Sequence, residues 1–207
     1  MTERPRRPRG RPLSFDRDEA LDRVLPVFWR KGFGGTSLDE LAAAAGLNRP
    51  NLAAAFGDKR ALYLAALRRF GARLSGEAAA ALASPGPLRA GLEAYFDRAA
   101  ALYTGEGLGC FVFATAPAAS GDEPEVRSAL AEAFAGLDAA LERRVAAAVR
   151  AGELPADVDA PGLATALSGV LLNLALRARA GASEAELRAL HRHALAAMKL
   201  TAAEWGR

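Results

Sequence analysis

Apolar residues recur every three or four positions along almost the whole chain, which is the spacing of amphipathic helices. No segment shows the strict alternation of apolar and polar residues that is typical of a strand. Glycine, proline and helix-capping residues divide the pattern into about nine helices, so the predicted fold class is all-α. The predicted helices span residues 16–31, 38–45, 49–56, 59–83, 88–104, 110–118, 124–151, 160–180 and 183–203.

The second and third predicted helices are short and are joined by a tight turn. Ser37 and Glu40 form an S-x-x-E capping box at the start of the first of them, with Thr36 as a rival cap. Gly46 ends this helix and Asn48 caps the next. This is the layout of a helix-turn-helix, whose second helix enters the DNA major groove. An ordinary helical hairpin within a bundle is the alternative.

Charge is unevenly distributed along the chain. The net charge is only +3, but residues 1–13 contain five arginines and one glutamate, a local charge of +4. Prolines and a glycine make this arm flexible. Basic arms follow phosphates or enter the minor groove, so we include Arg11 among the candidate DNA contacts. A solvated tail is the alternative.

Several short motifs resemble those of the TetR family of bacterial transcriptional regulators. They cover about a quarter of the chain, and their spacing is intact. The more specific motifs are W-R-K-G-F at 29–33, T-S-L at 36–38, L-A at 41–42, A-G-L at 45–47 and F-G-D-K-R-A-L at 56–62. Looser matches are G-C-F at 109–111, E-V-R at 125–127 and G-E-L-P at 152–155.

The resemblance implies a two-domain homodimer that binds double-stranded operator DNA. Residues 14–60 would form the helix-turn-helix domain after the basic arm, and residues 61–207 the ligand-binding and dimerisation domain. The fifth to seventh helices would enclose a cavity for a small-molecule effector, and the last two would form a four-helix bundle with the partner. An effector would change the separation of the two DNA-binding heads and release a palindromic operator, with half-sites about one helical turn apart or slightly more.

The candidate DNA contacts lie mainly at the start of the third predicted helix. Arg49 has the planar fork that fits guanine O6 and N7, and Asn51 can pair with an adenine edge. Helix capping or solvation is the alternative role for both. Lys59 occupies the phosphate-contacting position of the family. The full set is Thr36, Ser37, Asn48, Arg49, Pro50, Asn51, Lys59 and Arg11.

One residue departs from the family pattern. The family usually has a Leu-Tyr pair whose tyrosine hydroxyl contacts a phosphate, whereas this chain has Leu52-Ala53. A methyl group cannot donate that hydrogen bond, and its loss weakens DNA binding by roughly 1 kcal/mol.

The candidate effector contacts are aromatic residues in the region where the family has its cavity, together with polar residues in the eighth helix. An aromatic residue at helical spacing is also typical of plain core, and the polar pair could instead bond across the dimer interface. No acidic cluster points to this region, which favours an apolar or weakly anionic effector. The set is Tyr95, Phe96, Tyr103, Cys110, Phe111, Phe113, Phe134, Asn173 and Arg177.

Cys110 and the two histidines are the remaining candidates for chemistry. Cys110 stands near a helix start, which lowers a thiol pKa, so a redox or electrophile sensor is one reading. A small buried hydrophobe is the other. His191 and His193 are two apart on a helix and point to different faces, and no other ligand joins them at metal spacing. We therefore expect no metal and no cofactor.

The eighth predicted helix is apolar nearly all round, and the ninth adds further leucines. A helix that is apolar on all sides needs neighbours on all sides, which indicates homodimerisation through these two helices. The apolar positions are Leu163, Leu167, Val170, Leu171, Leu174, Leu187, Leu190, Leu195 and Met198.

The composition narrows the class of protein. The chain has no run of 18 apolar residues, no secretory signal and only one cysteine, which together indicate a cytoplasmic protein without a membrane span or internal disulfide. No nucleophile–base pair, facing carboxylate pair or phosphate-cradling loop indicates an enzyme. The leading hypothesis is a ligand-released DNA-binding repressor. A helical small-molecule-binding or scaffold protein without a DNA role, or a thiol sensor using Cys110, is the alternative.

Overall fold

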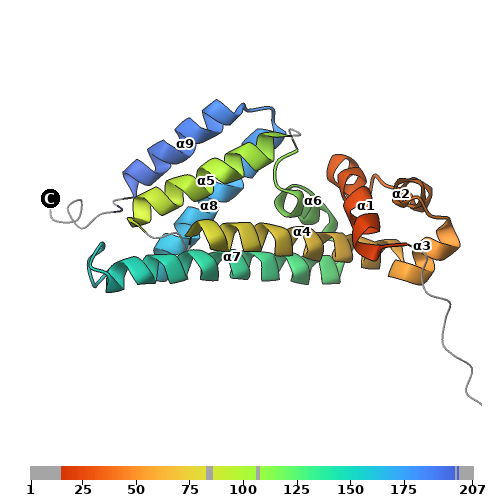
Figure 1. Ribbon diagram of the computed structural model, residues 1–207, viewed down its shortest axis with the longest axis horizontal. Coiled ribbons are helices and arrows are strands. Elements are labelled where there is room, and N and C mark those ends of the chain that lie inside the picture. The colour runs from red at the N-terminus through yellow and green to blue at the C-terminus, as the bar shows by residue number, and fades with distance from the viewer. Residues whose placement is uncertain (1–14, 83–85, 106–107, 199, 201–207) are drawn as a thin grey trace, which may run out of the picture.

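The computed structural model describes residues 15–82, 86–105, 108–198 and 200. These residues form nine helices and no strand, so the predicted all-α class is confirmed. Figure 1 shows a small head made of α1 to α3 at one end and a larger body of α5 to α9, with α4 extending from the head along α7. The helices are α1 Arg17–Lys31, α2 Leu38–Ala45, α3 Arg49–Phe56, α4 Lys59–Leu82, α5 Leu88–Gly105, α6 Phe111–Ala119, α7 Pro124–Arg150, α8 Ala160–Arg179 and α9 Glu184–Ala197.

Local sequence signals determine where the two short helices of the head begin and end. The side chain of Ser37 accepts a hydrogen bond from the Glu40 backbone N–H, and the Glu40 carboxylate accepts one from the Ser37 N–H, so the predicted capping box is confirmed. Gly46 has a φ of 69°, in the left-handed region, and ends α2. Asn48 caps α3 by accepting a hydrogen bond of 2.8 Å from the Asn51 N–H. These bonds fix the turn that sets α3 against α2.

The head is attached to the body through α4. The Arg69 guanidinium donates to the Asp22 carboxylate of α1 at 2.7 Å. The rings of Trp29 and Phe70 meet edge to face, with 5.1 Å between their centroids. The N-terminal half of α4 therefore packs on the head, while its C-terminal half runs along α7 in the body. The domain boundary predicted at residue 60 lies in the first turn of this shared helix.

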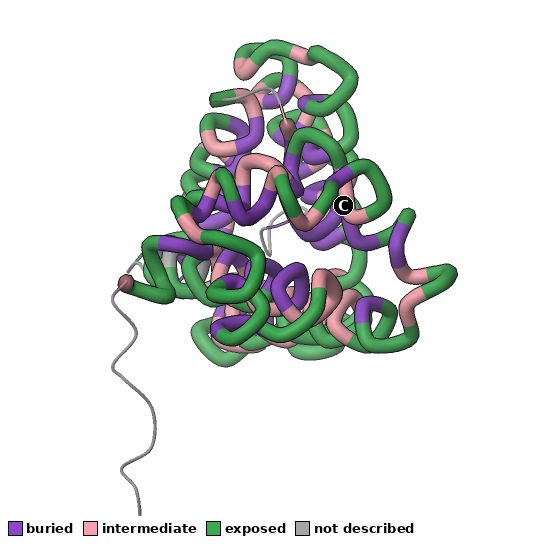
Figure 2. Tube along the Cα trace, turned by 90° about the vertical axis from the view of Figure 1, so that its right-hand side faces the viewer, coloured by how far each residue is buried: buried purple, intermediate pink, exposed green. Residues whose placement is uncertain are grey.

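The body buries most of its apolar side chains between α5, α7, α8 and α9. Figure 2, which looks onto the head, shows buried positions on the inner sides of the helices and exposed ones on their outer turns. The last helix is shorter than predicted, because α9 ends at Ala197 instead of residue 203. The chain leaves the helix there, and Leu200 is 1 % exposed in the core. Residues 201–207 lie outside the described part of the chain.

The helix α8 combines length with high hydropathy. An 18-residue window has a mean hydropathy of 1.2, so by length and composition alone α8 could cross a membrane, although the sequence has no uninterrupted apolar run of that length. Its inner side packs against α5, α6, α7 and α9. A helix with this composition is equally typical of the core of a helical protein.

Candidate DNA-binding and effector-binding sites

The first turn of α3 lies at the outer end of the head (Figure 1). Its inner side is anchored by Leu52 and Phe56, which are 2 % and 7 % exposed. Its first turn presents Arg49, Pro50 and Asn51, all of which are exposed. The structure therefore places these three predicted DNA contacts together on one free surface.

Arg49 has a partner in the DNA-free protein that the sequence did not indicate. Its Nε lies 2.6 Å from the Asp39 carboxylate of α2, and the two side chains are 58 % and 72 % exposed. An ion pair this exposed contributes little to stability, so the guanidinium is free to exchange Asp39 for another acceptor.

A second arginine that the sequence did not single out braces α3 from α1. The Arg17 guanidinium donates to the backbone carbonyl of Ala55 and lies over the Phe56 ring, 4.7 Å from its centroid. These contacts fix the C-terminal end of α3 on the head. They depend on how α1 crosses α3, which local sequence patterns do not contain.

The other predicted DNA contacts that the structure describes already make contacts within the protein. Thr36 is 6 % exposed and its hydroxyl donates to the Phe33 carbonyl at 3.0 Å. The N–H and hydroxyl of Ser37 both bond to the Glu40 carboxylate. The ammonium of Lys59 lies over the Phe33 ring, 4.7 Å from its centroid. Asn48 is exposed but serves as the α3 cap. Arg11 lies outside the described residues.

The residue that departs from the family pattern lies on the same outer surface. Ala53 is exposed, one turn after Arg49 on α3. The position therefore faces away from the core, and a methyl group there offers no hydrogen-bond donor to a phosphate.

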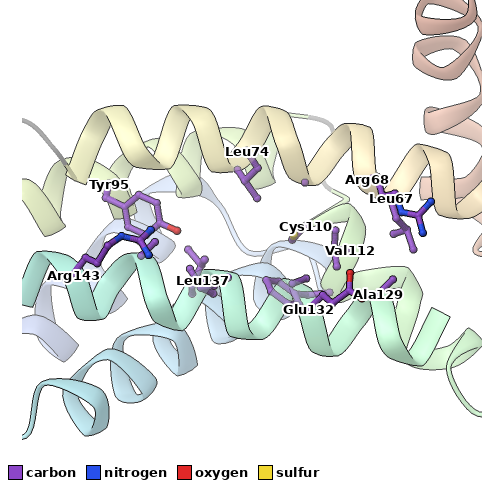
Figure 3. Close-up of a pocket in the computed structure, with 16 residues that line it drawn as sticks. Leu67, Arg68, Leu74, Tyr95, Cys110, Val112, Ala129, Glu132, Leu137 and Arg143 are labelled. Atoms are coloured by element: carbon purple, nitrogen blue, oxygen red, sulfur yellow. The ribbon is translucent and has the colours of Figure 1, made fainter. Parts of the chain in front are cut away.

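The body contains a cavity of about 450 Å³ between α4 and α7, lined also by residues of α5, α6 and α8, and its charged lining residues are exposed to solvent. This volume is within the range of small-molecule sites. Figure 3 shows Tyr95 and Arg143 at one end, Arg68 and Leu67 at the other, and Cys110 between them. The lining is Leu67, Arg68, Gly71, Leu74, Tyr95, Cys110, Val112, Phe113, Ala129, Glu132, Ala133, Gly136, Leu137, Ala140, Arg143 and Leu171.

Three of the predicted effector contacts, Tyr95, Cys110 and Phe113, line this cavity. Phe134 lies behind Phe113, with 4.9 Å between their ring centroids. The charged lining residues were missed because neither aromatic periodicity nor the family motifs mark them. The rotation of α7 about its own axis decides which of its side chains face α4.

Five other predicted effector contacts do not line the cavity. Phe96, Tyr103 and Phe111 are at most 1 % exposed and belong to the core. Asn173 and Arg177 lie on the exposed side of α8, where the Arg177 Nε donates to the Asn173 side-chain oxygen at 2.8 Å. They point away from the cavity because the inner side of α8 is occupied by leucines.

The environment of Cys110 does not favour thiolate formation. The residue is fully buried. Burial raises the pKa of its thiol to about 11, against the opposing effect of hydrogen bonds from the Phe113 and Val112 backbone and the Tyr103 hydroxyl. A thiol with this pKa is almost entirely protonated at neutral pH and is a poor nucleophile. The structure therefore supports the small-hydrophobe reading of Cys110.

His191 is a buried polar residue at the α5–α9 contact. Its ring is 0 % exposed, its Nε2 is 2.9 Å from an Asp97 carboxylate oxygen, and it stacks on Phe96 with 5.6 Å between ring centroids. His193 is exposed, so the two histidines face different sides as predicted. In the described part of the chain, no group of three His, Cys, Asp or Glu residues has metal-site geometry.

One stripe of α8 is uncovered in the protomer. Leu176 is 58 % exposed, the largest exposure of a bulky apolar side chain among the described residues. The small residues Ala166 and Gly169 are exposed on the same stripe. On α9, Leu190 and Ala194 are only half-buried. Small and apolar residues at helical spacing form a surface on which another helix can pack closely.

Two family models match the chain. "Bacterial regulatory proteins, tetR family" matches residues 21–66, which include α2 and α3. "Tetracyclin repressor-like, C-terminal domain" matches residues 87–194, more than half of the chain. The first match contains the helix-turn-helix and the second contains most of the cavity lining.

The chain is similar in sequence to a repressor and in structure to other regulators. The HTH-type transcriptional repressor ComR of Escherichia coli (strain K12) is 32 % identical over 178 residues, which are 84 % of this chain and 85 % of ComR. The solved structure of a cysteine mutant of the TetR-family regulator CifR, complexed with a 26-base-pair double-strand operator DNA, has a TM-score of 0.84 at 31 % identity and covers 90 % of this chain and 99 % of that chain. The reduced form of E. coli NemR has a TM-score of 0.76 at 23 % identity, covers 90 % and 97 % of the two chains, and supports the fold.

The two family models, the ComR similarity and the shared architecture agree with the helix-turn-helix head and the cavity described above. They confirm the predicted family and the predicted regulatory function. The chain belongs to the TetR family of ligand-responsive, DNA-binding transcriptional regulators.

Proposed function

We propose that the chain acts as a cytoplasmic homodimeric repressor whose two heads bind the half-sites of a palindromic operator, and that a small molecule in the cavity between α4 and α7 releases the DNA. The observation that carries the proposal is the position of α3. Its inner side chains, Leu52 and Phe56, are buried in the head, and the outer side of its first turn is exposed. A short rigid helix presented in this way fits the DNA major groove.

Within this surface, each predicted residue has a distinct role. Arg49 pairs with guanine O6 and N7, and Asn51 with an adenine edge. Asn48 and Pro50 shape the start of the helix. Phosphate contacts come from the start of α2 at Thr36 and Ser37, from Lys59, and from the basic arm through Arg11. The DNA-binding unit then comprises residues 14–60, preceded by the arm at 1–13, and residues 61–207 hold the effector and the partner.

The partner protomer covers the exposed stripe of α8. Leu176, Ala166 and Gly169 present an apolar surface that a single chain leaves in water, and α9 lies beside it with Leu190 half-buried. A second copy of α8 and α9 packed on this stripe would complete a four-helix bundle. Asn173 lies on the same stripe, four positions after Gly169 and three before Leu176, so it is positioned to contribute polar contacts within that bundle together with Arg177.

The helix α6 connects the cavity to the head. Cys110 and Val112 line the cavity, and Phe111 between them packs on Trp29 and Tyr63, with 5.8 Å between ring centroids in each case. The Tyr63 hydroxyl shares a 2.5 Å hydrogen bond with the Thr115 hydroxyl of α6. A ligand that displaces the start of α6 therefore acts directly on α1 and α4.

A backbone carbonyl just before α6 adds a second connection. The Leu108 carbonyl accepts a hydrogen bond from the Trp29 indole at 3.1 Å and another from the Arg179 guanidinium at 3.3 Å. The same Arg179 nitrogen donates to the Trp29 carbonyl at 3.2 Å. The end of α8, the approach to α6 and the end of α1 are thus tied at one point, so a shift in the body is transmitted to the head.

Salt-dependent DNA binding tests this proposal. Affinity of the purified full-length protein for labelled duplex DNA is measured by fluorescence anisotropy between about 50 and about 200 mM salt. Several phosphate contacts per head predict a loss of affinity of roughly a hundredfold or more over this range. Binding that does not change with salt, or no binding to duplex DNA at low salt, would contradict the proposal.

A further inference from the structure

The two arginines of the cavity lining lie toward its opposite ends, with Glu132 between them. Figure 3 shows Arg143 and Tyr95 toward one end of the cavity and Arg68 toward the other. Glu132 is the acidic residue of the lining. It precedes Arg143 by eleven positions on α7, which is about 16 Å along the helix axis. This separation is too large for an ion pair, so Glu132 does not neutralise the Arg143 end.

Arg143 has no acidic or hydrogen-bonding partner among the described residues. The next residue, Arg144, is different because its guanidinium donates to the Gly86 carbonyl at 2.8 Å. Arg143 is an exposed residue of the cavity lining, so its N–H donors are available to a ligand that enters from solvent. A guanidinium binds a carboxylate through two parallel hydrogen bonds, which is a directional and strong contact.

Tyr95 supplies a second donor at the same end. Its side chain is 5 % exposed and its hydroxyl makes no hydrogen bond with the described residues. Burial raises the pKa of this hydroxyl, and the nearby Cys110 adds to the shift. The hydroxyl therefore stays protonated at neutral pH and can donate to an anionic oxygen.

The rest of the cavity is apolar. Leu74, Leu137, Val112, Phe113 and Leu171 form most of its walls, and the glycines and alanines of α4 and α7 leave room between them. A ligand that fills this space buries hydrocarbon along most of its length and meets the charge of Arg143 at one end. The same asymmetry disfavours cations and molecules that are polar throughout.

We propose that the effector is an amphipathic monocarboxylate, whose carboxylate is bound by the Arg143 guanidinium and the Tyr95 hydroxyl and whose apolar body lies against Leu74, Leu137 and Phe113. This inference rests on the proposed function of the cavity as the effector site. It adds the chemical class of the effector and the two side chains that recognise it.

Competition with a fluorescent probe tests the proposal on the full-length dimer. 8-Anilinonaphthalene-1-sulfonate bound to the protein is displaced by decanoate, decan-1-ol or decyltrimethylammonium, and dissociation constants are obtained for each. We expect Arg143→Gln to weaken decanoate binding by roughly tenfold or more, because it removes charged hydrogen bonds, and to leave decan-1-ol binding unchanged. Tyr95→Phe should give a smaller loss for decanoate alone.

The matched control is Arg150→Gln, which removes the same charge from α7 at a position that is exposed, as Arg143 is, but does not line the cavity. It should leave decanoate binding unchanged, and circular dichroism should show that all variants remain folded. Equal effects of Arg143→Gln and Arg150→Gln, tighter binding of the ammonium compound than of decanoate, or no displacement by any of the three would overturn the assignment.

A separate DNA-binding measurement keeps the two proposals apart. If decanoate binds through Arg143 but does not lower affinity for DNA, the ligand class is supported and release by the cavity is contradicted. If Arg143→Gln does not change decanoate binding, the ligand class is wrong, whatever decanoate does to DNA binding.

Discussion

Replacing Arg49 with alanine should weaken DNA binding and relax the preference for one base in each half-site. A bidentate arginine–guanine contact is worth about 1–3 kcal/mol of discrimination. In the free protein Arg49 is bonded to Asp39 at 2.6 Å, and the two side chains are 58 % and 72 % exposed. Such an exposed pair is worth about 0.2–1 kcal/mol, and it is lost when Arg49 turns to the DNA.

The loss of binding free energy caused by Arg49→Ala therefore lies in the lower part of the range of about 1–3 kcal/mol. We expect a loss of about 1–2 kcal/mol for each half-site, or about 5- to 30-fold in Kd. Asp39→Asn should have the opposite sign and tighten binding by at most about 1 kcal/mol, because it removes the competing carboxylate. Neither change should alter the free energy of unfolding by much, since both side chains are exposed.

Fluorescence anisotropy on a labelled operator gives these values, at one fixed salt concentration. Each protein is measured on the native duplex and on a duplex with the contacted guanine replaced. The guanine replacement should weaken DNA binding by wild-type protein but hardly change binding by Arg49→Ala. If Arg49→Ala binds as tightly as wild type, or if the base replacement costs both proteins the same affinity, Arg49 does not contact this guanine.

Three further predictions concern the dimer, the thiol and the head. Leu176→Arg places a charge on the exposed stripe of α8 and should convert the dimer to monomers in light scattering, whereas an unchanged mass would place the interface elsewhere. Burial raises the pKa of the Cys110 thiol to about 11, so a disulfide reagent should label native protein at neutral pH far more slowly than unfolded protein, and equal rates would contradict this. Hydrogen bonds from Lys31 and then Ser37 lower the pKa of Glu40 from 4.5 to about 2, so its contribution to stability is present above about pH 4.5 and is lost as the pH falls towards 2. Thermal unfolding measured over this pH range should show a loss of stability towards pH 2 that is smaller in Glu40→Gln than in wild type. An identical pH profile for both proteins would contradict this role of Glu40.

Local signals in the sequence were sufficient for the head. The capping box at Ser37, the left-handed Gly46 and the Asn48 cap are each determined by residues within four positions of one another, and all three are present in the structure. The partners of Arg49 and of Phe56 were not predicted. Asp39 of α2 contacts Arg49, and Arg17 of α1 contacts Phe56. Both contacts depend on the angles between helices, which a periodic pattern does not specify.

The sequence predicted a cavity enclosed by the fifth to seventh helices, whereas the structure has one between α4 and α7 with a different set of lining side chains. Aromatic spacing identified Tyr95 and Phe113, yet it equally identified Phe96 and Phe111, which are core residues with no exposure. Burial and cavity lining have the same sequence signature, because both require apolar side chains on the inner face of a helix. In the sequence, Arg143 is only a charge on the face of α7 that also carries Leu137 and Ala140. Whether this face lines a cavity depends on the rotation of α7 against α4, which the sequence pattern does not specify.

Selection of binding sites from a random pool of duplex DNA by the purified full-length protein tests the central claim most directly. Two α3 helices held at a fixed distance by an α8–α9 dimer predict a palindromic consensus, whose half-site centres are about 10 base pairs apart or slightly more. Arg49→Ala should lose the guanine in both halves together. A pool with no enriched sequence, or a consensus that is a single asymmetric site, would contradict the account.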